Sequence, residues 1–270
     1  MRNILKKVIG RLKSSKFFAG LLDNEEHKKN HVIDTYRLSH GLPTIDLLEL
    51  FPVFEETVEP YCFLEGSSSP LDIGILKSMA RKYNPCSYLE IGTWRGESMA
   101  NVAGVADRCV SISLSNRELM EMGYGEPFIK NNFLFSNGIG NVTHIAHNSH
   151  TFDFSTLGER FDIIFIDGDH RYEGVKIDTM NAFKLLRNER SVIIWHDYGT
   201  SPEQVRWSVL AGILDGCPEG KRDHLYHISN SLCAIYIMGE FKTDYQQFPE
   251  IPNKTFRVRI SLGEKELREP

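Results

Sequence analysis

Two apolar runs of this chain each end in aspartate and histidine, the residue types that bind metal ions and transfer protons. The first run ends in Asp167, with His170 three positions later, and the second run ends in His196 and Asp197. Carboxylates and imidazoles can hold a divalent ion together, and an imidazole can also act as a general base. Because the two segments share this pattern, the sequence predicts one polar site built from both of them.

Strand-like and helix-like segments alternate through the middle of the chain. The strand-like segments are Ser87–Gly92, Cys109–Leu114, Val142–Ala146, Phe161–Asp167, Ser191–His196, His224–Ser229 and Cys233–Met238. The helix-like segments are Leu71–Tyr83, Ser98–Ala106, Arg117–Met122, Tyr172–Leu186 and Pro202–Leu214. This alternation predicts an α/β fold, with a mostly parallel sheet that helices cover on both faces. Ligands bind at the carboxyl ends of such strands, so we expect Asp167 and His196 to lie together there.

The chain is expected to divide into three parts. Residues 1–65 form an N-terminal helical lead-in that can act as a lid, residues 66–240 form the α/β domain, and residues 241–270 form a polar tail. The last two strand-like segments of the domain are separated by residues 230–232 only, which is too short for a crossover helix. We therefore expect these two strands to form an antiparallel hairpin at one edge of the sheet.

A glycine turn follows the first strand-like segment of the domain. Glu90, Gly92 and Gly96 give the spacing E-x-G-x-x-x-G, and glycine lets the backbone approach a ligand closely. Neither the dinucleotide fingerprint G-x-G-x-x-G nor a Gly-Lys-Ser/Thr phosphate loop is present here. The turn is compatible both with a ligand-binding role and with a purely structural one.

From residue 66 to residue 240 the chain resembles the class I S-adenosylmethionine-dependent methyltransferases. The resemblance implies a Rossmann-like, seven-stranded sheet and S-adenosyl-L-methionine as the cofactor. In that family the glycine turn approaches the amino acid part of the cofactor, and the acid before the turn helps to fix it. Carried over to this sequence, the cofactor-binding positions are Glu90, Gly92, Thr93, Trp94, Gly96, Ser113, Asn148, Ser149 and Asp167.

A narrower resemblance rests on residues 167–175 and 196–198. These blocks are similar to a bacterial subgroup of small-molecule, sugar or antibiotic O-methyltransferases related to macrocin O-methyltransferase. Two positions depart from the family. Ser113 stands where an acid usually binds the ribose hydroxyls, and Asn148 stands where an acid often meets the adenine amine. A serine offers one hydroxyl where a carboxylate accepts two charge-assisted hydrogen bonds, so the departures predict weaker nucleoside binding.

The acid and histidine site has two chemical interpretations. Asp167 resembles the metal-binding acid of catechol-type O-methyltransferases, His196 and Asp197 replace a further pair of metal ligands there, and His170 coincides with the lysine base. The first interpretation is a divalent metal ion such as Mg²⁺ or Mn²⁺ on Asp167, His196 and Asp197, which would acidify a hydroxyl. The second has no metal and uses His170 or His196 as the general base, because the unperturbed pKa of histidine is about 6.5.

A structural interpretation is also open for the first of the two segments. Asp167 and Asp169 could cap the helix that begins near Tyr172, because aspartate is common at helix starts. Capping explains one acidic segment, but it does not explain why two strands end alike. Glu173 and Asp178 are expected on the solvated side of that helix.

Composition limits the partners and the compartment. The net charge of −5 over 270 residues gives no bias toward nucleic acid. The five cysteines are scattered and contain no C-x-x-C pair, which favours a reducing, cytoplasmic location. Residues 1–22 carry six basic and no acidic side chains, with apolar residues at helical spacing. This segment predicts an amphipathic helix that lies on the inner membrane face, or that packs on the domain or on a second subunit in a homodimer.

Taken together, the residues predict a cytoplasmic, S-adenosylmethionine-dependent O-methyltransferase that acts on a hydroxyl of a small molecule or sugar. Two alternatives remain open. One is a methyltransferase-fold protein that binds partners without catalysis, as the residues at Ser113 and Asn148 suggest. The other is a metal-dependent hydroxylase or hydrolase on the same scaffold, which the adjacent His196 and Asp197 would allow.

Overall fold

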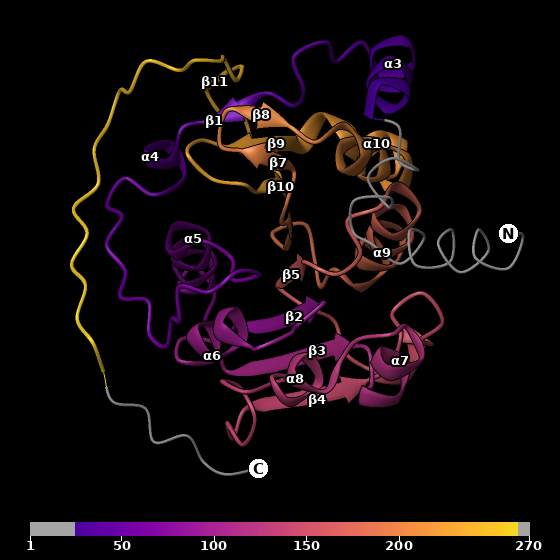
Figure 1. Cartoon of the computed structure of the whole chain (residues 1–270). Helices are drawn as coiled ribbons and strands as arrows, with labels where there is room; N and C mark the ends of the chain where they lie inside the picture. Colours follow the sequence, from indigo (N-terminus) through magenta and orange to yellow (C-terminus); the bar gives the residue numbers. More distant parts are fainter. Residues whose placement is uncertain (1–24, 264–270) are drawn as a thin grey trace, which may run out of the picture.

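The computed structural model describes residues 25–263, which form a nine-stranded sheet flanked by helices (Figure 1). The order across the sheet is β11-β1-β9-β10-β6-β5-β2-β3-β4. Its strands are β1 (Thr44–Ile45), β2 (Ser87–Ile91), β3 (Arg108–Ser113), β4 (Val142–Ala146), β5 (Ile163–Ile166), β6 (Val192–Trp195), β9 (Leu225–Ile228), β10 (Ala234–Tyr236) and β11 (Thr243–Asp244). The helices are α3 (Glu25–Tyr36), α4 (Leu47–Leu50), α5 (Pro70–Ala80), α6 (Glu97–Ala103), α7 (Asn116–Glu121), α8 (Glu126–Lys130), α9 (Tyr172–Leu185) and α10 (Trp207–Gly216), with short 3₁₀ turns at Phe154–Leu157 and Glu219–His224.

The predicted Rossmann-like α/β fold class is confirmed. Five neighbouring strands run parallel to one another, in the order β6, β5, β2, β3 and β4. In contrast, β10 lies between β6 and β9 and is antiparallel to both. All seven predicted strands form, each to within two residues of its expected ends. They form because apolar, β-branched runs such as that of β5 can be buried on both faces of a parallel sheet.

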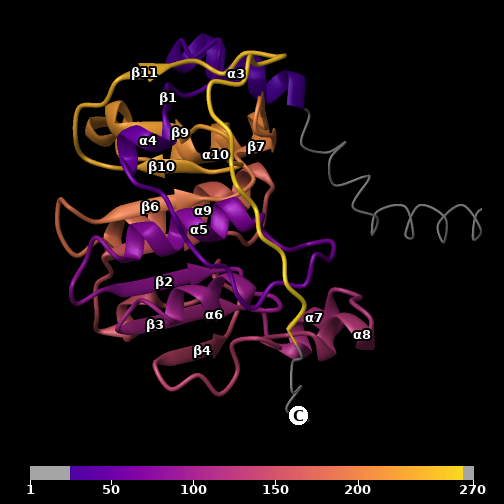
Figure 2. The same ribbon diagram turned by 90° about the vertical axis from the view of Figure 1, so that its left-hand side faces the viewer.

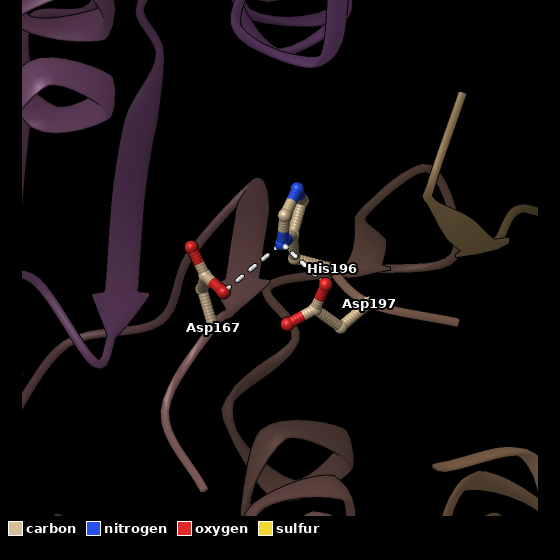
Figure 3. Close-up of side chains that lie close together, drawn as sticks. All are labelled: Asp167, His196 and Asp197. Atoms are coloured by element: carbon tan, nitrogen blue, oxygen red, sulfur yellow. Dashed lines mark ion pairs between the residues drawn. The ribbon is translucent and has the colours of Figure 1, made fainter. Parts of the chain in front are cut away.

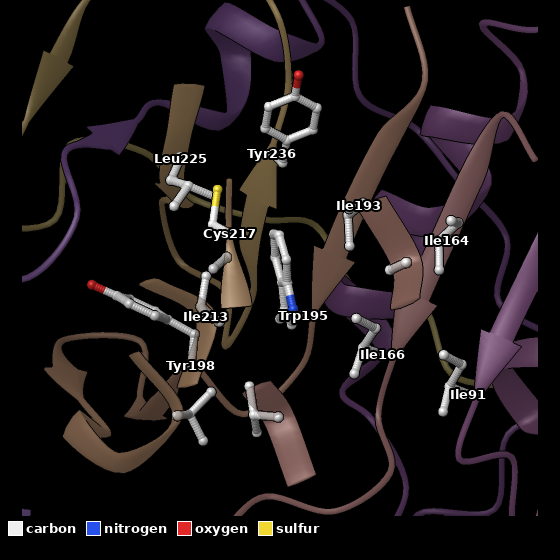
Figure 4. Packing of buried hydrophobic residues seen from close by; sticks show 14 of the residues in the cluster. Ile91, Ile164, Ile166, Ile193, Trp195, Tyr198, Ile213, Cys217, Leu225 and Tyr236 are labelled. Atoms are coloured by element: carbon white, nitrogen blue, oxygen red, sulfur yellow. The ribbon is translucent and has the colours of Figure 1, made fainter. Parts of the chain in front are cut away.

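Alternate residues of the central strands enter two separate cores. On one face Ile164 and Ile166 of β5 belong to the cluster that includes residues of α9 and α10. On the other face Ile163 and Phe165 pack with residues of α4, α5 and α6. Figure 1 shows these helix groups on opposite sides of the sheet, and Figure 4 shows the first cluster around Trp195. The alternation follows from the two-residue period of a strand.

The sheet extends beyond the antiparallel pair that the sequence predicts. The pair β9 and β10 forms as expected, but it is not the edge, because β1 pairs with β9 in parallel and β11 pairs with β1. The strand β1 comes from the lead-in and β11 from the tail. Figures 1 and 2 show the tail, in yellow, running along the side of the molecule that also carries residues 51–65.

One helix begins later than the sequence indicates. The prediction started it at Pro202, whereas residues 199–205 form a hairpin of β7 (Gly199–Ser201) and β8 (Gln204–Val205), and α10 begins at Trp207. Pro202 lies in the loop of this hairpin, where its missing N–H breaks no strand pairing. The hairpin stands next to Asp197, so the difference changes the surroundings of the candidate site.

Two expectations concern membranes and termini. In the described part of the chain, none of the helices combines the length and apolarity that a bilayer crossing requires. The amphipathic helix expected in residues 1–22 lies outside the described residues.

Candidate functional site

Three side chains converge where β5 and β6 end. Asp167 follows β5, and His196 and Asp197 follow β6, as the sequence predicts. One donor atom from each residue lies within 4.8 Å of the other two. Figure 3 shows the imidazole of His196 facing both carboxylates, with Nδ1 3.2 Å from Asp167 Oδ1 and 3.5 Å from Asp197 Oδ1. We call these three residues the donor cluster.

His196 Nδ1 is a buried atom without a well-formed hydrogen bond, although two carboxylates lie near it. Burial alone would lower the pKa of His196, but the carboxylates of Asp167, Asp197 and Asp72 raise this pKa well above its ordinary value. This shift favours the cationic ring, in which Nδ1 keeps a proton. A nitrogen and two carboxylates that converge without good hydrogen bonds fit a divalent metal ion in place of that proton.

The outer atoms of the donor cluster are held by other residues. Ser68 Oγ donates a hydrogen bond to Asp167 Oδ2 at 3.2 Å. Asp197 Oδ2 lies 3.2 Å from His170 Nδ1 and 3.5 Å from Arg206 Nη1. Burial would raise the pKa of Asp197, but His196, His170 and Arg206 lower it well below its usual range. Asp197 also adopts a left-handed backbone with φ of 55°, which is uncommon outside glycine and occurs often at functional sites.

The glycine turn after β2 touches the donor cluster through the backbone. A Cβ on Gly92 would lie 2.3 Å from the carbonyl oxygen of Asp167 and 2.4 Å from Gly168 Cα, and the φ of Gly92 is +105°. Only glycine fits such a close approach in this conformation. The second glycine of the turn, Gly96, is held in the same way by Ser136, whose Oγ would lie 2.1 Å from an added Cβ. Close packing therefore explains why glycine occupies both positions, and Gly92 brings the turn next to the donor cluster.

The acid before the turn points into the protein. Glu90 is only 1% exposed and accepts hydrogen bonds from Tyr88, Thr93 and Ser98 at 2.7, 2.6 and 2.9 Å. Burial raises the pKa of Glu90, and these three hydroxyls oppose the shift. Its carboxylate thus fixes the shape of the turn through Thr93.

Ser113 joins the turn after β2 to the end of β3. Its Oγ donates to the carbonyl oxygen of Thr93 at 2.7 Å, and its own carbonyl accepts from His147 N at 2.7 Å. The loops after β2, β3 and β4 therefore meet at Ser113, as a nucleoside site built from all three would need. The same bond occupies the hydroxyl proton of Ser113, which leaves only its oxygen lone pairs for a ligand.

Three other predicted cofactor residues have partners within the protein. Trp94 donates from Nε1 to Phe128 O at 3.1 Å and stacks on the Phe128 ring at a centroid distance of 4.2 Å. The Oδ1 atom of Asn148 accepts from His150 N at 2.9 Å, in a local turn. Ser149 lies in the same loop, between Asn148 and His150. These contacts make Trp94 and Asn148 structural supports of the loops around the site.

The capping interpretation fails for Asp167 and holds in part for its neighbour. The N-cap of α9 is Arg171, which makes no side-chain capping hydrogen bond, and Asp167 contacts Ser68 and His196 instead. Asp169 accepts a hydrogen bond from Arg171 N at 3.0 Å and pairs with the Arg171 guanidinium. Asp169 therefore orders the loop before α9, and Asp167 is left for the donor cluster.

Asp178 contradicts the expectation of a solvated position on α9. Its side chain is fully buried, neither carboxylate oxygen has a well-formed hydrogen bond, and His150 Nε2 lies 3.9 Å from Oδ2. Burial raises the pKa of Asp178 to about 6. Glu173 is exposed, as expected. The prediction failed for Asp178 because a polar side chain gives no sequence signal that it is buried.

Comparison with known proteins gives a family match over part of the chain. Residues 89–198 match the family model of a methyltransferase domain. The match includes the glycine turn, the loops after β3 and β4, and all three residues of the donor cluster. Ser68, Asp72 and Arg206, which surround the donor cluster, lie outside the matched methyltransferase domain.

Individual proteins are more distant. An uncharacterized protein of Acanthamoeba polyphaga mimivirus is 29% identical over 158 residues, which cover 53% of this chain and 64% of that protein. Among solved structures, an O-methyltransferase from Bacillus cereus in complex with S-adenosylhomocysteine is 20% identical, with a TM-score of 0.44, and the match covers 65% of this chain and 84% of that one. An O-methyltransferase from Streptomyces achromogenes, involved in tomaymycin synthesis, is 16% identical, with a TM-score of 0.42, and covers 83% of this chain and 95% of that one.

Sequence reasoning missed four residues around the candidate site. Ser68, Asp72 and Arg206 are separated from the donor cluster along the chain, so no local motif connects them to it. Glu118 did leave a signal, because Ser115 and Glu118 form a capping box at the start of α7. Its carboxylate also accepts from Asn148 N at 3.2 Å, so it bridges the loops after β3 and β4.

Proposed function

We propose that this protein is an S-adenosylmethionine-dependent methyltransferase that transfers a methyl group to a hydroxyl of a small molecule or sugar, assisted by a divalent metal ion. The methyltransferase-domain match supports the methyl transfer. The observation that carries the choice of oxygen as acceptor is the donor cluster beside the glycine turn. Such a cluster can acidify or deprotonate a hydroxyl, a step that methyl transfer to oxygen needs.

The metal ion would be held by Asp167, His196 and Asp197. The buried, poorly hydrogen-bonded Nδ1 of His196 supports this assignment. Two carboxylates favour Mg²⁺ or Mn²⁺, and the imidazole shifts the preference toward Mn²⁺ and other transition metals. Bound there, the ion would lower the pKa of an acceptor hydroxyl. Neighbouring side chains would hold the three ligand residues in position around the ion.

His170 is the better candidate for a general base than His196. The His170 side chain is 42% exposed and its Nδ1 is held by Asp197, so the other ring nitrogen is left for a substrate proton. His196 is buried among three carboxylates, which keep its proton in place. In this proposal His196 serves as a ligand, and His170 removes the proton of the acceptor.

The cofactor would lie over the turn after β2 and the ends of β3 and β4, and it would supply the methyl group. Thr93 and the backbone of the glycine turn would contact its amino acid part. The nucleoside would be contacted by the oxygen lone pairs of Ser113 and by the side-chain amide of Asn148. The carboxylate of Glu118 would bridge the loops that carry these two residues. Because these residues offer few strong hydrogen-bonding groups, we expect the protein to bind the nucleoside part of the cofactor with modest affinity.

Calorimetric titration of the full chain with S-adenosylhomocysteine tests the cofactor assignment. We expect one binding site per chain. A parallel titration with Mn²⁺ tests the metal assignment, with Asp167→Asn expected to weaken binding. Absence of heat with S-adenosylhomocysteine at high protein concentration would rule out the methyltransferase proposal, and absence of Mn²⁺ binding alone would leave a metal-free base mechanism through His170.

A binding protein without catalysis is the second candidate. The internal hydrogen bonds of Ser113 and Asn148 favour it, because both residues already use side-chain groups that the cofactor would otherwise engage. The first titration separates the two candidates. Tight binding of Fe²⁺ with oxygen consumption would instead favour a hydroxylase on the same scaffold. The cytoplasmic location, the membrane contact through residues 1–22, the homodimer and the lack of nucleic acid partners remain predictions.

A further inference from the structure

Asp72 is a fully buried carboxylate that the methyltransferase-domain match does not include. It lies in the first turn of α5, and its Oδ2 is 3.3 Å from Nε2 of His196. The other oxygen, Oδ1, accepts from Leu232 N at 3.2 Å, in the loop between β9 and β10. Asp72 therefore joins α5, the end of β6 and the β9–β10 loop at one buried point.

The contact with Asp72 decides how the His196 ring is oriented. Because Nε2 is turned toward Asp72, Nδ1 is the nitrogen that faces Asp167 and Asp197. A ring rotated by half a turn about the Cβ–Cγ bond would instead turn the carbon Cδ2 toward Asp167 and Asp197 and the carbon Cε1 toward Asp72, so both polar contacts would be lost. A carboxylate behind a metal-binding histidine fixes the ring and its tautomer in this way.

The same short segment also holds a second ligand. Ser68, four residues before Asp72 and 7% exposed, donates to the outer oxygen of Asp167. The inner oxygen of Asp167, Oδ1, is thereby the one that faces His196 Nδ1. One segment of the chain, residues 68–72, thus contacts two of the three residues of the donor cluster from behind.

We propose that residues 68–72 complete the metal site, with Asp72 positioning the His196 imidazole and Ser68 positioning the Asp167 carboxylate. This inference rests on the metal assignment in the proposed function and extends it beyond the matched domain. The segment raises metal affinity by holding both ligands in their binding geometry before the ion arrives. Residues 89–198 alone would contain the same three ligands but would not hold them in that geometry before the ion binds.

Asp72 also has a structural role, which the test has to separate. It forms a capping box with Ser69, in which Ser69 N donates to Asp72 Oδ2 and Asp72 N donates to Ser69 Oγ. Capping stabilises α5 but does not require His196. A purely structural role would therefore lower the stability of the fold and leave the metal affinity of the folded protein unchanged.

The decisive experiment is a calorimetric titration of Mn²⁺ into the full-length wild type and Asp72→Asn, with the folded fraction measured for each. We expect the affinity to fall by roughly 10- to 100-fold in Asp72→Asn. The matched control is Asp162→Asn, because Asp162 is a buried carboxylate at the opposite end of β5 that accepts from Ser87 and Arg187. This control should lose stability and keep the wild-type Mn²⁺ affinity.

A further variant keeps the proposal open to refutation even if Asp72→Asn fails to fold. Ser68→Ala removes only one hydroxyl and should also weaken Mn²⁺ binding, while the visible spectrum of bound Co²⁺ should change in both variants. In a His196→Ala background, Asp72→Asn should have no further effect on the affinity, because Asp72 acts through the lost ring.

The outcomes distinguish the inference from the function on which it rests. Wild-type affinity for Mn²⁺ in both Ser68→Ala and Asp72→Asn would overturn the inference while the metal assignment stands. A wild type that binds S-adenosylhomocysteine but no Mn²⁺ would overturn the metal assignment and the inference together, and would leave the methyltransferase proposal in place.

Discussion

His170 and Asp197 lie in contact at the carboxyl end of the sheet, with Nδ1 of the histidine 3.2 Å from Oδ2 of the aspartate. The histidine side chain is 42% exposed, whereas that of Asp197 is 21% exposed. An exposed imidazole held by a more buried carboxylate is oriented without being enclosed. This arrangement suits a base that must meet a substrate arriving from solvent.

Replacing His170 by alanine should remove this base. We expect kcat to fall by about 10²- to 10⁴-fold, while the affinity for S-adenosylhomocysteine stays at the wild-type value, because His170 contacts Asp197 and is not one of the proposed cofactor-binding residues. Steady-state kinetics and calorimetry measure the two quantities. His224→Ala, at the opposite end of the sheet, is the control. Equal activity in His170→Ala and wild type would mean that another group takes the proton.

Gly92→Ala should strongly destabilise the fold. The added Cβ would meet the backbone of Asp167 at 2.3 Å, and the φ of +105° is itself unfavourable for alanine. We expect the free energy of unfolding to drop by about 2–5 kcal/mol, the combined cost of strain and overpacking. Gly158→Ala is the matched control, because Gly158 also has a positive φ but no atom within 4 Å of its Cβ position. Urea denaturation should show that Gly158→Ala lowers the free energy of unfolding by about 1–2 kcal/mol, from backbone strain alone. If both variants lost the same free energy of unfolding, the predicted clash at Gly92 would be contradicted.

Asp178→Asn should make stability less dependent on pH. The folded-state pKa of about 6 lies above the ordinary value of 3.8, so Asp178 favours the fold fully below pH 3.8, and this contribution is lost as the pH rises through about 6. The neutral asparagine avoids that loss. We expect Asp178→Asn to be more stable than wild type at pH 8, by up to about 3 kcal/mol, and similar to wild type near pH 4.

Thermal or urea unfolding at the two pH values measures this difference. Glu173→Gln, an exposed acid on the same helix, should change stability equally at both. If Asp178→Asn gave the same change at pH 4 and at pH 8, the pKa of Asp178 would not be raised in the folded protein.

Arg95 should hold the lead-in segment over the glycine turn. Its guanidinium is buried, lies 3.3 Å from Glu97 Oε2, and donates to Glu65 O at 3.0 Å and to Ser67 Oγ at 2.7 Å. Arg95→Gln leaves Glu97 buried without its cation, so we expect a loss of about 3–5 kcal/mol in the free energy of unfolding. Limited proteolysis should then cut faster around residues 62–67.

The exposed pair of Arg117 and Glu121 provides the comparison. Arg117→Gln should cost less than about 0.5 kcal/mol and leave proteolysis unchanged, because exposed helix pairs contribute little. If residues 62–67 were cleaved no faster in Arg95→Gln than in wild type, contacts other than those of Arg95 would hold the segment.

The sequence predicted the central strands and the donor cluster for the same reason. Long apolar runs bury themselves in a parallel sheet, and the polar residues that end adjacent strands then meet at one edge. Asp167, His196 and Asp197 could be found from the ends of two runs alone. Their assignment to one cluster needed only the rule that parallel strands finish on the same side.

Other parts of the site depend on contacts between distant segments. Asp72 reaches His196 across 124 residues of chain, and a single acid in a helix carries no sign of such a partner. The two-residue strands β1 and β11 are too short to show any period. The sequence predicts a helix from Pro202, within the hairpin of residues 199–205, because proline suits a helix start as well as a turn.

The pairing of β1 with both β9 and β11 limits how this protein can be shortened. Thr44 is paired with His227 on one side and with Asp244 on the other, so segments from near both chain ends seal the outer margin of the sheet. A fragment trimmed to residues 66–240 would bare a row of peptide groups along β9. Exposed rows of this kind recruit other chains, and we expect such a fragment to self-associate even where the rest of its sheet is properly folded.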